Sequence, residues 1–311
     1  MCCGFIMIIT HILSGPRMRL LQTILKISPK LPSKSYQKLS RFIHVKDILG
    51  TISVFVQICI YVPKTEEFNV WGVMASIFAV YCVLVVVHTN MLYINCVYVL
   101  KACFKNINDD LMHIQKLMVN DTRPSCVSML IGHIKRILLI ELKILKKRHL
   151  MLSNAVQMMN IVFSLQLLAI ILMIFSITTF ELYFYIVHWR DGILISFDDP
   201  LFDKCLMSII FWATQMMLLV WICETGKNQA QQICTTIHDL LNNTSDKQVK
   251  DELQLFSLQL LHRDNTFSAK GLNVDATLFA AFMGSITTYM LILIQFLIMS
   301  HSCDKKSILH K

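Results

Sequence analysis

Charged side chains are scarce in this sequence. Only 16% of its 311 residues are Asp, Glu, Lys or Arg, and 55% are hydrophobic, whereas about a quarter of the residues in an ordinary soluble domain are charged. A soluble chain of this length has no interior large enough to hide so much apolar surface. The composition therefore argues against a soluble globular protein and favours a membrane protein.

Motifs that carry enzymatic or metal chemistry are also missing. The sequence contains no GxSxG or HExxH pattern, no phosphate-binding glycine loop and only nine glycines. Its eleven cysteines include no CxxC pair and no Cys/His cluster at zinc spacing. We therefore expect no catalytic residues, no cofactor and no metal site, and we interpret most cysteines as small packing residues.

The net charge of +9 does not indicate a nucleic-acid partner. Aromatic residues are not interleaved with basic ones, and the basic residues stand between apolar runs, which is the pattern of a protein in a lipid bilayer.

Five apolar runs are long enough to cross a bilayer, at about residues 43–62, 70–97, 155–187, 205–223 and 276–299. The last has no ionisable side chain, and its 24 residues make about 36 Å of helix, more than the roughly 30 Å of a hydrocarbon core. The first reaches full length only if Phe42 to Lys46 adds a turn and Lys46 extends to the membrane surface. Residues 1–15 are too short to span, and we interpret them as a remnant span or a membrane-surface segment.

The segments between these runs are mainly basic. Residues 16–46 contain three prolines, which predicts a loop. Residues 101–150 and 224–275 have helical apolar spacing, with a turn at 242–246 and a capping box formed by Ser245 and Gln248. The sequence thus predicts an all-α fold, a polytopic transmembrane helix bundle with cytoplasmic helical extensions.

The distribution of Lys and Arg predicts the orientation. There are eight in residues 16–46, ten in 101–150 and five in 224–275, but only one in 63–67, two in 188–204 and three after 299. By the positive-inside rule, the basic loop 16–46 is cytoplasmic and the tail 300–311 is extracellular. An extracellular C-terminus argues against the G-protein-coupled class.

Polar residues inside the spans allow two interpretations. Thr288 and Gln295 are seven residues apart and share one helix face. They either hydrogen-bond between packed helices or line an aqueous path. For His88, Asn90 and Asn95 in the second span, we expect structural hydrogen bonds.

The last span resembles the terminal span of insect gustatory receptors. In both, a Thr-Tyr pair (Thr288, Tyr289) is followed by five apolar residues and a Gln-Phe pair (Gln295, Phe296). Further resemblance lies in the segments 106–111 and 149–168 and in the approach to the span, namely Phe267, Ala269, Gly271 and Asp275. It covers roughly residues 43–299.

The resemblance implies a chemosensory receptor that is itself a ligand-gated cation channel. In that family, seven spans place the N-terminus inside and the C-terminus outside, so we expect this chain to lack the first span and most of the second. Four identical or related subunits surround a pore lined by the last span. The pore and gate positions implied here are Thr288, Tyr289, Leu291, Ile292, Gln295 and Phe296.

The expected ligand is a small-molecule tastant, bound in the outer half of the bundle at the plasma membrane. By position, the pocket candidates are Tyr81, Glu181, Tyr185, Trp212 and Gln215, because aromatic faces with a few polar anchors suit a small organic molecule. Each of these residues alone also fits a packing or interface role. The alternative function is a non-conducting accessory subunit or a carrier, in which the Thr288/Gln295 face only binds a neighbouring helix.

Overall fold

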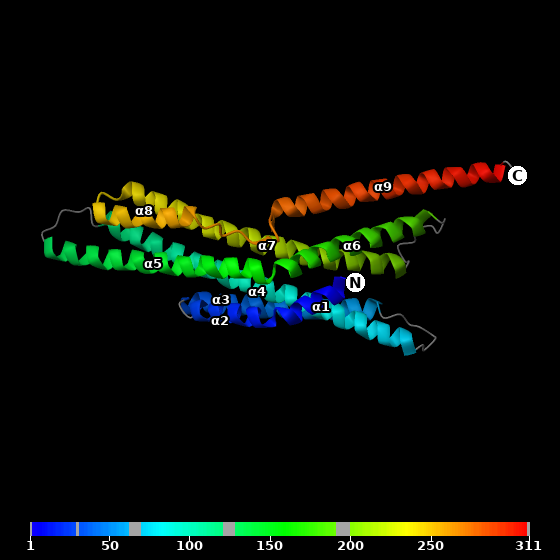
Figure 1. The fold of residues 1–311 in the computed structure, drawn as a ribbon, viewed down its shortest axis with the longest axis horizontal. Helices are drawn as coiled ribbons and strands as arrows, with labels where there is room; N and C mark the ends of the chain where they lie inside the picture. Colours follow the sequence, from blue (N-terminus) through cyan, green and yellow to red (C-terminus); the bar gives the residue numbers. More distant parts are fainter. Residues whose placement is uncertain (1, 29–30, 62–69, 121–127, 191–199, 310–311) are drawn as a thin grey trace.

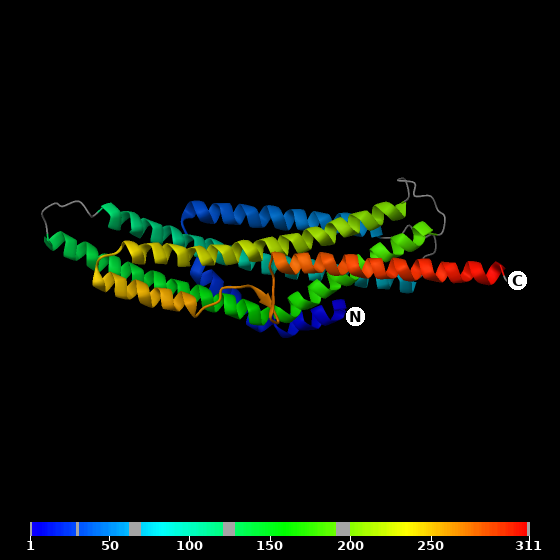
Figure 2. The ribbon, with the colours of Figure 1, turned by 90° about the horizontal axis from the view of Figure 1, so that it is seen from above.

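The computed structural model describes residues 2–28, 31–61, 70–120, 128–190 and 200–309. Within these ranges the chain forms an elongated bundle of helices that run nearly along one axis (Figures 1 and 2). The all-α prediction is confirmed, with one small hairpin as an addition. The predicted connection 63–67 and most of 188–204 lie outside the described residues.

The helices are α1 (Cys2–Ile12), α2 (Ser14–Ile27), α3 (Ser33–Tyr61), α4 (Val70–Asn120), α5 (Ser128–Val162), α6 (Ser164–Arg190), α7 (Pro200–Asn243), α8 (Lys247–Leu261) and α9 (Ala276–Leu309). The hairpin consists of β1 (Ser268–Ala269) and β2 (Leu272–Asn273) and stands between α8 and α9.

Five of the described helices are long and apolar enough to cross a membrane: α3, α4, α6, α7 and α9. They correspond in number and order to the five predicted runs. Two of them extend far beyond the predicted spans, because α4 has 51 residues and α7 has 44. At 1.5 Å per residue these helices are about 75 and 65 Å long, so each continues well past a bilayer core.

The segment predicted as a loop, residues 16–46, is helical. It forms most of α2 and the first half of α3. Pro16 stands in the first turn of α2, where the missing N–H has no helical acceptor to lose. Arg17 is buried, donates a hydrogen bond to Gln166 of α6 and lies 5.1 Å from the ring centre of Phe163. These contacts and those of α1 with α4 and α6 fix the N-terminal segment on the bundle.

The run predicted as the third span, residues 155–187, is divided between two helices. The helix from Ser128 is interrupted at Phe163, and α6, which is long and apolar enough to cross a membrane, begins at Ser164. Residues Leu152, Val156 and Met159 of the preceding turns are fully buried against protein. Their apolar side chains therefore serve the interior of the bundle, which hydropathy alone does not distinguish from contact with lipid.

The predicted turn between α7 and α8 is confirmed, but the predicted cap is not. Asp246, and not Ser245, caps α8: its carboxylate accepts hydrogen bonds from the N–H groups of Gln248 (2.9 Å) and Val249 (3.1 Å). Lys135 of α5 pairs with Asp246 at 2.5 Å, and these interactions hold the pKa of the carboxyl below its usual value.

The centre of the fold is the pair of long helices α4 and α7, which pack along much of their length. At one end of the bundle α5 and α8 join them, as both ribbon views show (Figures 1 and 2). The largest fully buried side chains of α4 run from Tyr93 to Ile114, towards this end. The other end, which contains the first turns of α4, is mostly exposed within the single chain.

Candidate functional site

A tight hairpin determines where α9 begins. Its two turn residues, Lys270 (φ 52°) and Gly271 (φ 88°), both have left-handed backbone conformations, as a two-residue hairpin turn requires. Phe267, just before the hairpin, is buried against Gly226 of α7. Asn160 of α5 accepts from the Ser268 N–H (3.1 Å) and donates to the Thr266 carbonyl, which ties the hairpin to the bundle.

Asp275 caps the first turn of α9. Its carboxylate accepts from the N–H groups of Thr277 (3.1 Å) and Leu278 (3.2 Å) and from the Thr277 hydroxyl, and Lys227 of α7 lies 3.8 Å away. The hydrogen bond from the Thr277 side chain is the main cause of a lowered pKa of this carboxyl. The Phe267, Ala269, Gly271 and Asp275 signature thus consists of a packing anchor, a buried strand residue, a turn and a cap.

One side of α9 packs on the rest of the chain. Ile286 and Met290 are buried, and Phe282 makes an edge-on ring contact with Phe175 of α6 at 5.7 Å. Helix α9 packs mainly on α6 and α7, and it runs along one edge of the molecule (Figure 1). Most of its remaining surface is exposed within the single chain.

The opposite side of α9 carries the two predicted polar positions. Thr288 stands about 200° round the helix from Ile286, and Gln295 about 140° from Met290; both are exposed. The Thr288 hydroxyl donates to the Gly284 carbonyl of its own helix at 2.9 Å. Neither residue is packed between the described helices, so the packing interpretation requires a partner outside the described part of the chain.

The other four predicted pore positions are also exposed, but they face in different directions. Leu291 and Ile292 flank Thr288 and Gln295 around the helix. Tyr289 instead turns towards α6, where its ring centre lies 5.8 Å from that of Phe175. Phe296 is 68% exposed. A pore role for all six positions stays a prediction.

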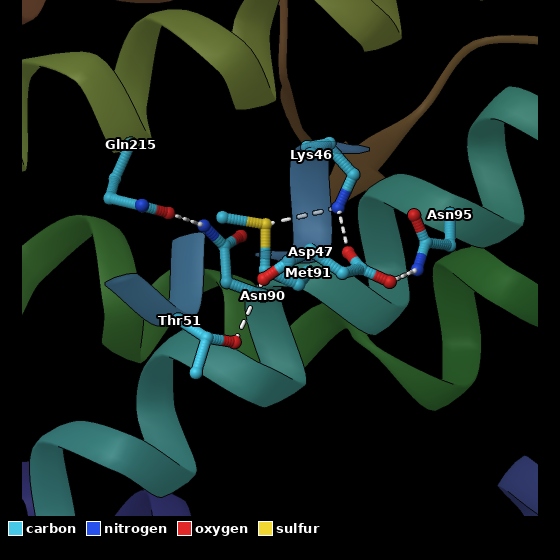
Figure 3. Close-up of polar contacts among 7 residues, drawn as sticks. All are labelled: Lys46, Asp47, Thr51, Asn90, Met91, Asn95 and Gln215. Carbon is cyan, nitrogen blue, oxygen red and sulfur yellow. Dashed lines mark hydrogen bonds and ion pairs between the residues drawn. The ribbon is translucent and has the colours of Figure 1, made fainter. Parts of the chain in front are cut away.

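A partly buried polar cluster joins α3 to α4 (Figure 3). Lys46 pairs with Asp47 at 2.5 Å and donates to the sulfur of Met91 at 3.1 Å. The second carboxylate oxygen of Asp47 accepts from the Asn95 amide at 3.0 Å. The expectation that Lys46 extends to the membrane surface is wrong, because its side chain is only 6% exposed. A charged amine in this environment requires its nearby anion.

The same cluster continues from α4 to α7. The Asn90 amide donates to the Gln215 side-chain oxygen at 3.1 Å, and both residues are buried. The structural hydrogen bonds expected of Asn90 and Asn95 are therefore confirmed. His88 differs: it is exposed, and its ring nitrogen contacts the Leu84 carbonyl of its own helix. With Asp47, Thr51 and Asn95 it lines a cavity of about 210 Å³.

The whole of this architecture matches one family. The model of the family described as "7tm Chemosensory receptor" covers residues 1–300. The chain belongs to the 7tm chemosensory receptor family. The receptor is therefore a membrane protein of a family of receptors, not of enzymes, and the resemblance to gustatory receptors is confirmed.

Curated relatives come from Drosophila melanogaster. Putative gustatory receptor 28b is 34% identical over 157 residues, which are 48% of this chain and 32% of that protein. Putative gustatory receptor 28a is 34% identical over 110 residues, 35% of this chain and 24% of that protein. Putative gustatory receptor 2a is 54% identical over 46 residues, 14% and 11% of the two chains. Each match therefore spans about a third or less of the relative's length.

Solved structures of the insect olfactory receptor OR5 from Machilis hrabei share the fold. The complex with eugenol aligns with a TM-score of 0.66 over 95% of this chain and 79% of that chain, at 11% identity. A second OR5 structure aligns with a TM-score of 0.67 over 95% and 78% of the two chains, at 10% identity. At such identities the likeness shows the fold alone.

The five predicted pocket residues differ in exposure, and a shared pocket for them stays a prediction. Tyr81 is 54% exposed on α4, whereas Trp212 and Gln215 are buried on α7. Glu181 and Tyr185 are half-buried on α6. None of the five lines the 210 Å³ cavity beside the polar cluster.

Glu181 and Gln215 also join helices. The Ser208 hydroxyl of α7 donates to the Glu181 carboxylate at 2.6 Å, and the Cys205 thiol donates to the Glu181 carbonyl at 3.6 Å. Gln215 binds Asn90 of α4. Sequence reasoning missed these partners. For the polar cluster between α3 and α4, the available signal was an acid next to a lysine, Lys46-Asp47, at the start of an apolar run.

Proposed function

We propose that the receptor is a subunit of a ligand-gated cation channel that opens when a small-molecule tastant binds. Identical or related subunits, four by the family resemblance, place their α9 helices around a shared conduit. The observation that carries the proposal is the division of α9 into a packed side and an exposed side with Thr288 and Gln295. An amide facing lipid is costly, so this side needs water or another subunit.

The position of each side chain on α9 suggests its role in such a conduit. Thr288 and Gln295, on the side away from α6, would face the axis, with Leu291 and Ile292 next to them. A ring of apolar side chains such as Leu291 and Ile292 can close a pore by dewetting. A ring of glutamine amides offers dipoles to a passing cation. Tyr289 contacts α6, so we place it with Phe296 at the edge of the conduit.

Helix α6 offers a physical connection between ligand and conduit. Near its outer end Glu181 is bonded to Ser208 of α7, and two turns earlier Phe175 contacts Phe282 and Tyr289 of α9. A tastant that binds among Glu181, Tyr185, Trp212 and Gln215 would change how α6 rests on α7, and α9 would follow. The ligand shifts the receptor towards the open arrangement only through its higher affinity for that state.

We place the receptor in the plasma membrane, with the basic segments in the cytoplasm and the C-terminus outside. The distribution of Lys and Arg supports this orientation. It predicts that the acceptor sequence at Asn242, at the end of α7, carries no glycan. A shift in electrophoretic mobility after glycosidase treatment that Asn242→Gln abolishes would reverse the orientation.

The channel proposal is tested by current and by accessibility. Cells that express the receptor alone or with related subunits should show tastant-evoked cation current, and Gln295→Ala should change its conductance or selectivity. Thr287→Ala, a matched control on α9 whose hydroxyl bonds its own helix, should not. Cysteines at Thr288 and Gln295 should react with a water-soluble thiol reagent, and cysteines at Ile286 and Met290 should not.

The reverse labelling pattern would overturn the conduit. In that case, and if no combination of subunits carries current, a non-conducting accessory subunit or a carrier would replace the channel.

A further inference from the structure

A second cavity lies between α7 and the first turn of α9. Its volume is about 520 Å³, and its walls are almost wholly apolar, with Met217, Leu218 and Val220 on one side and Phe279 on the other. Along α7 it reaches from Thr214 to Thr225. These residues span about 16 Å, or roughly half the thickness of a hydrocarbon core. The cavity, which is open along its side, is therefore about as long as one leaflet is thick.

Polar groups gather at one end of this cavity. The Lys101 amine donates to the Thr225 hydroxyl at 2.9 Å and lies 4.9 Å from the ring centre of Trp221 and 5.8 Å from that of Tyr98. Thr225 and Trp221 line the cavity, so the amine lies at its rim. Aromatic residues beside a lysine at the end of a span are typical of the membrane–water interface.

An acid stands at the same rim. Glu224 lines the cavity next to Thr225. Within the described part of the chain, neither Glu224 nor Lys101 takes part in an ion pair. A cation and an anion that are not bonded to each other thus stand at the mouth of one apolar cavity.

The level of this rim follows from the sequence. Lys101 comes just after the second predicted span, Glu224 directly after the fourth, and Ala276 opens the last. All three spans therefore reach the same membrane surface here, the one that faces the basic segments. An apolar cavity is a poor site for water, and an occupant at this depth has to combine an apolar chain with a polar head that carries both charges.

We propose that this cavity holds one acyl chain of a zwitterionic glycerophospholipid, with the phosphate at Lys101 and the amine at Glu224. The lipid fills the gap between α7 and the first turn of α9 and supports the position of that turn. Binding does not depend on ion conduction, so the proposal stands or falls separately from channel function.

The test is photolabelling of the whole receptor in lipid nanodiscs. The probe is phosphatidylcholine with a diazirine near the end of one acyl chain, and labelled peptides are identified by mass spectrometry. We expect labelling of residues 214–225 and 276–279 well above that of the exposed α3 surface around Ile52 and Phe55. Equal labelling of the two regions would mean ordinary surrounding lipid and would overturn the proposal.

Variants separate the polar and apolar parts of the site. Lys101→Gln should lower labelling about tenfold, because a charge-assisted hydrogen bond to phosphate is lost. Lys143→Gln makes the same charge change on the exposed face of α5 and should leave labelling unchanged. Ala276→Phe fills the cavity from the start of α9 and should abolish labelling. Unchanged labelling in both Lys101→Gln and Ala276→Phe would refute the site.

The headgroup is tested with a second probe. Phosphatidylglycerol carries the phosphate but no amine, so Glu224→Gln should lower phosphatidylcholine labelling several-fold and should not lower phosphatidylglycerol labelling. Unfolding temperatures of the variants show whether each is folded. If cysteines placed at Trp221 cross-link two copies of the receptor, another subunit covers the cavity and the lipid assignment is wrong.

Discussion

The end of the bundle where α4, α5, α7 and α8 meet and the helix α9 are packed in opposite ways. Helix α8 is amphipathic and largely polar, yet it buries Val249, Leu253 and Phe256 almost completely. Helix α9 is far more apolar, yet of its described side chains only Ile286 and Met290 are buried. Between these two helices, burial within the single chain therefore does not follow hydrophobicity, which is expected where lipid or other subunits cover apolar surface.

Polar groups are also treated differently in the two regions. At the packed end they bind other helices: Arg148 of α5 pairs with Asp110 of α4 at 3.0 Å, and Lys146 pairs with Glu252 of α8. On α9 the Thr287 and Thr288 hydroxyls donate to carbonyls of their own helix. Polar side chains at the packed end thus hold neighbouring helices together, whereas the two threonine hydroxyls of α9 bond to no other described helix.

The largest expected difference in stability comes from truncating a large side chain in each region. Phe104 of α4 is completely buried, and Phe104→Ala should lower the free energy of unfolding by about 3–5 kcal/mol through lost burial and a cavity. Phe296→Ala removes the same atoms from an exposed position on α9 and should change it by less than about 0.5 kcal/mol. Denaturant unfolding of the purified receptor measures both, and similar losses would contradict the comparison.

The largest pH effect should come from the packed end. His149 of α5 is fully buried, with its ring nitrogens near the amides of Gln259 (3.1 Å) and Asn265 (3.3 Å). Burial, with a smaller contribution from Arg263, lowers its pKa to about 4. The unfolded chain, with an ordinary pKa near 6.5, takes up this proton first. Stability should therefore fall as the pH drops from about 6.5 to 4, by on the order of 3 kcal/mol.

The histidine contribution is isolated by comparing two variants. His149→Gln should remove that part of the pH dependence, and His238→Gln, at an exposed position on α7, should retain it. Unfolding at a series of pH values measures the slopes. Equal slopes in wild type and His149→Gln would show that the buried imidazole is not the cause.

Two helical glycines test close packing in each region. A methyl group on Gly226 of α7 would lie 2.9 Å from the buried ring of Phe267 and 3.3 Å from Val97, so Gly226→Ala should cost about 1–3 kcal/mol. A methyl group on Gly284 of α9 would meet no described atom within 4 Å. Gly284→Ala should be neutral or stabilise by up to about 1 kcal/mol. The change in thermal unfolding temperature shows whether each substitution stabilises or destabilises the receptor. A stabilising Gly226→Ala would contradict the close packing at this glycine.

The smallest effect concerns the two aspartate caps. Asp275→Ala at α9 and Asp246→Ala at α8 should each cost about 1 kcal/mol. Because the pKa of each carboxyl is lowered by its folded-state partners, the stabilisation is present above the unfolded pKa and is lost as the pH falls through the folded value. Hydrogen exchange of the first turns of α8 and α9 measures the local loss of stability. Asp275→Asn keeps a capping oxygen and should retain most of the stabilisation.

Sequence reasoning missed the partners of two charged residues for one physical cause. Lys46 was expected at the membrane surface and Glu181 at the interface or in a pocket, because a charge in an apolar run is judged from its position along the chain. Their partners, Asp47 with Asn95 and Ser208 with Cys205, include residues on other helices. The same limit explains the loop predicted at residues 16–46: its prolines are visible, but the buried contacts of Arg17 that hold α2 in place are not.

The sequence by itself determined the five apolar helices that are long enough to cross a membrane, their order, the turn before α8 and the shared face of Thr288 and Gln295. These features depend on hydropathy and helical period, which are summed over neighbouring residues. Only the tertiary structure decided that α4 and α7 continue as single helices into the packed end, that Asn90 meets Gln215, and that the polar face of α9 is left uncovered. Those outcomes depend on which distant segments come together. A local stretch of residues does not determine the free energy of such contacts.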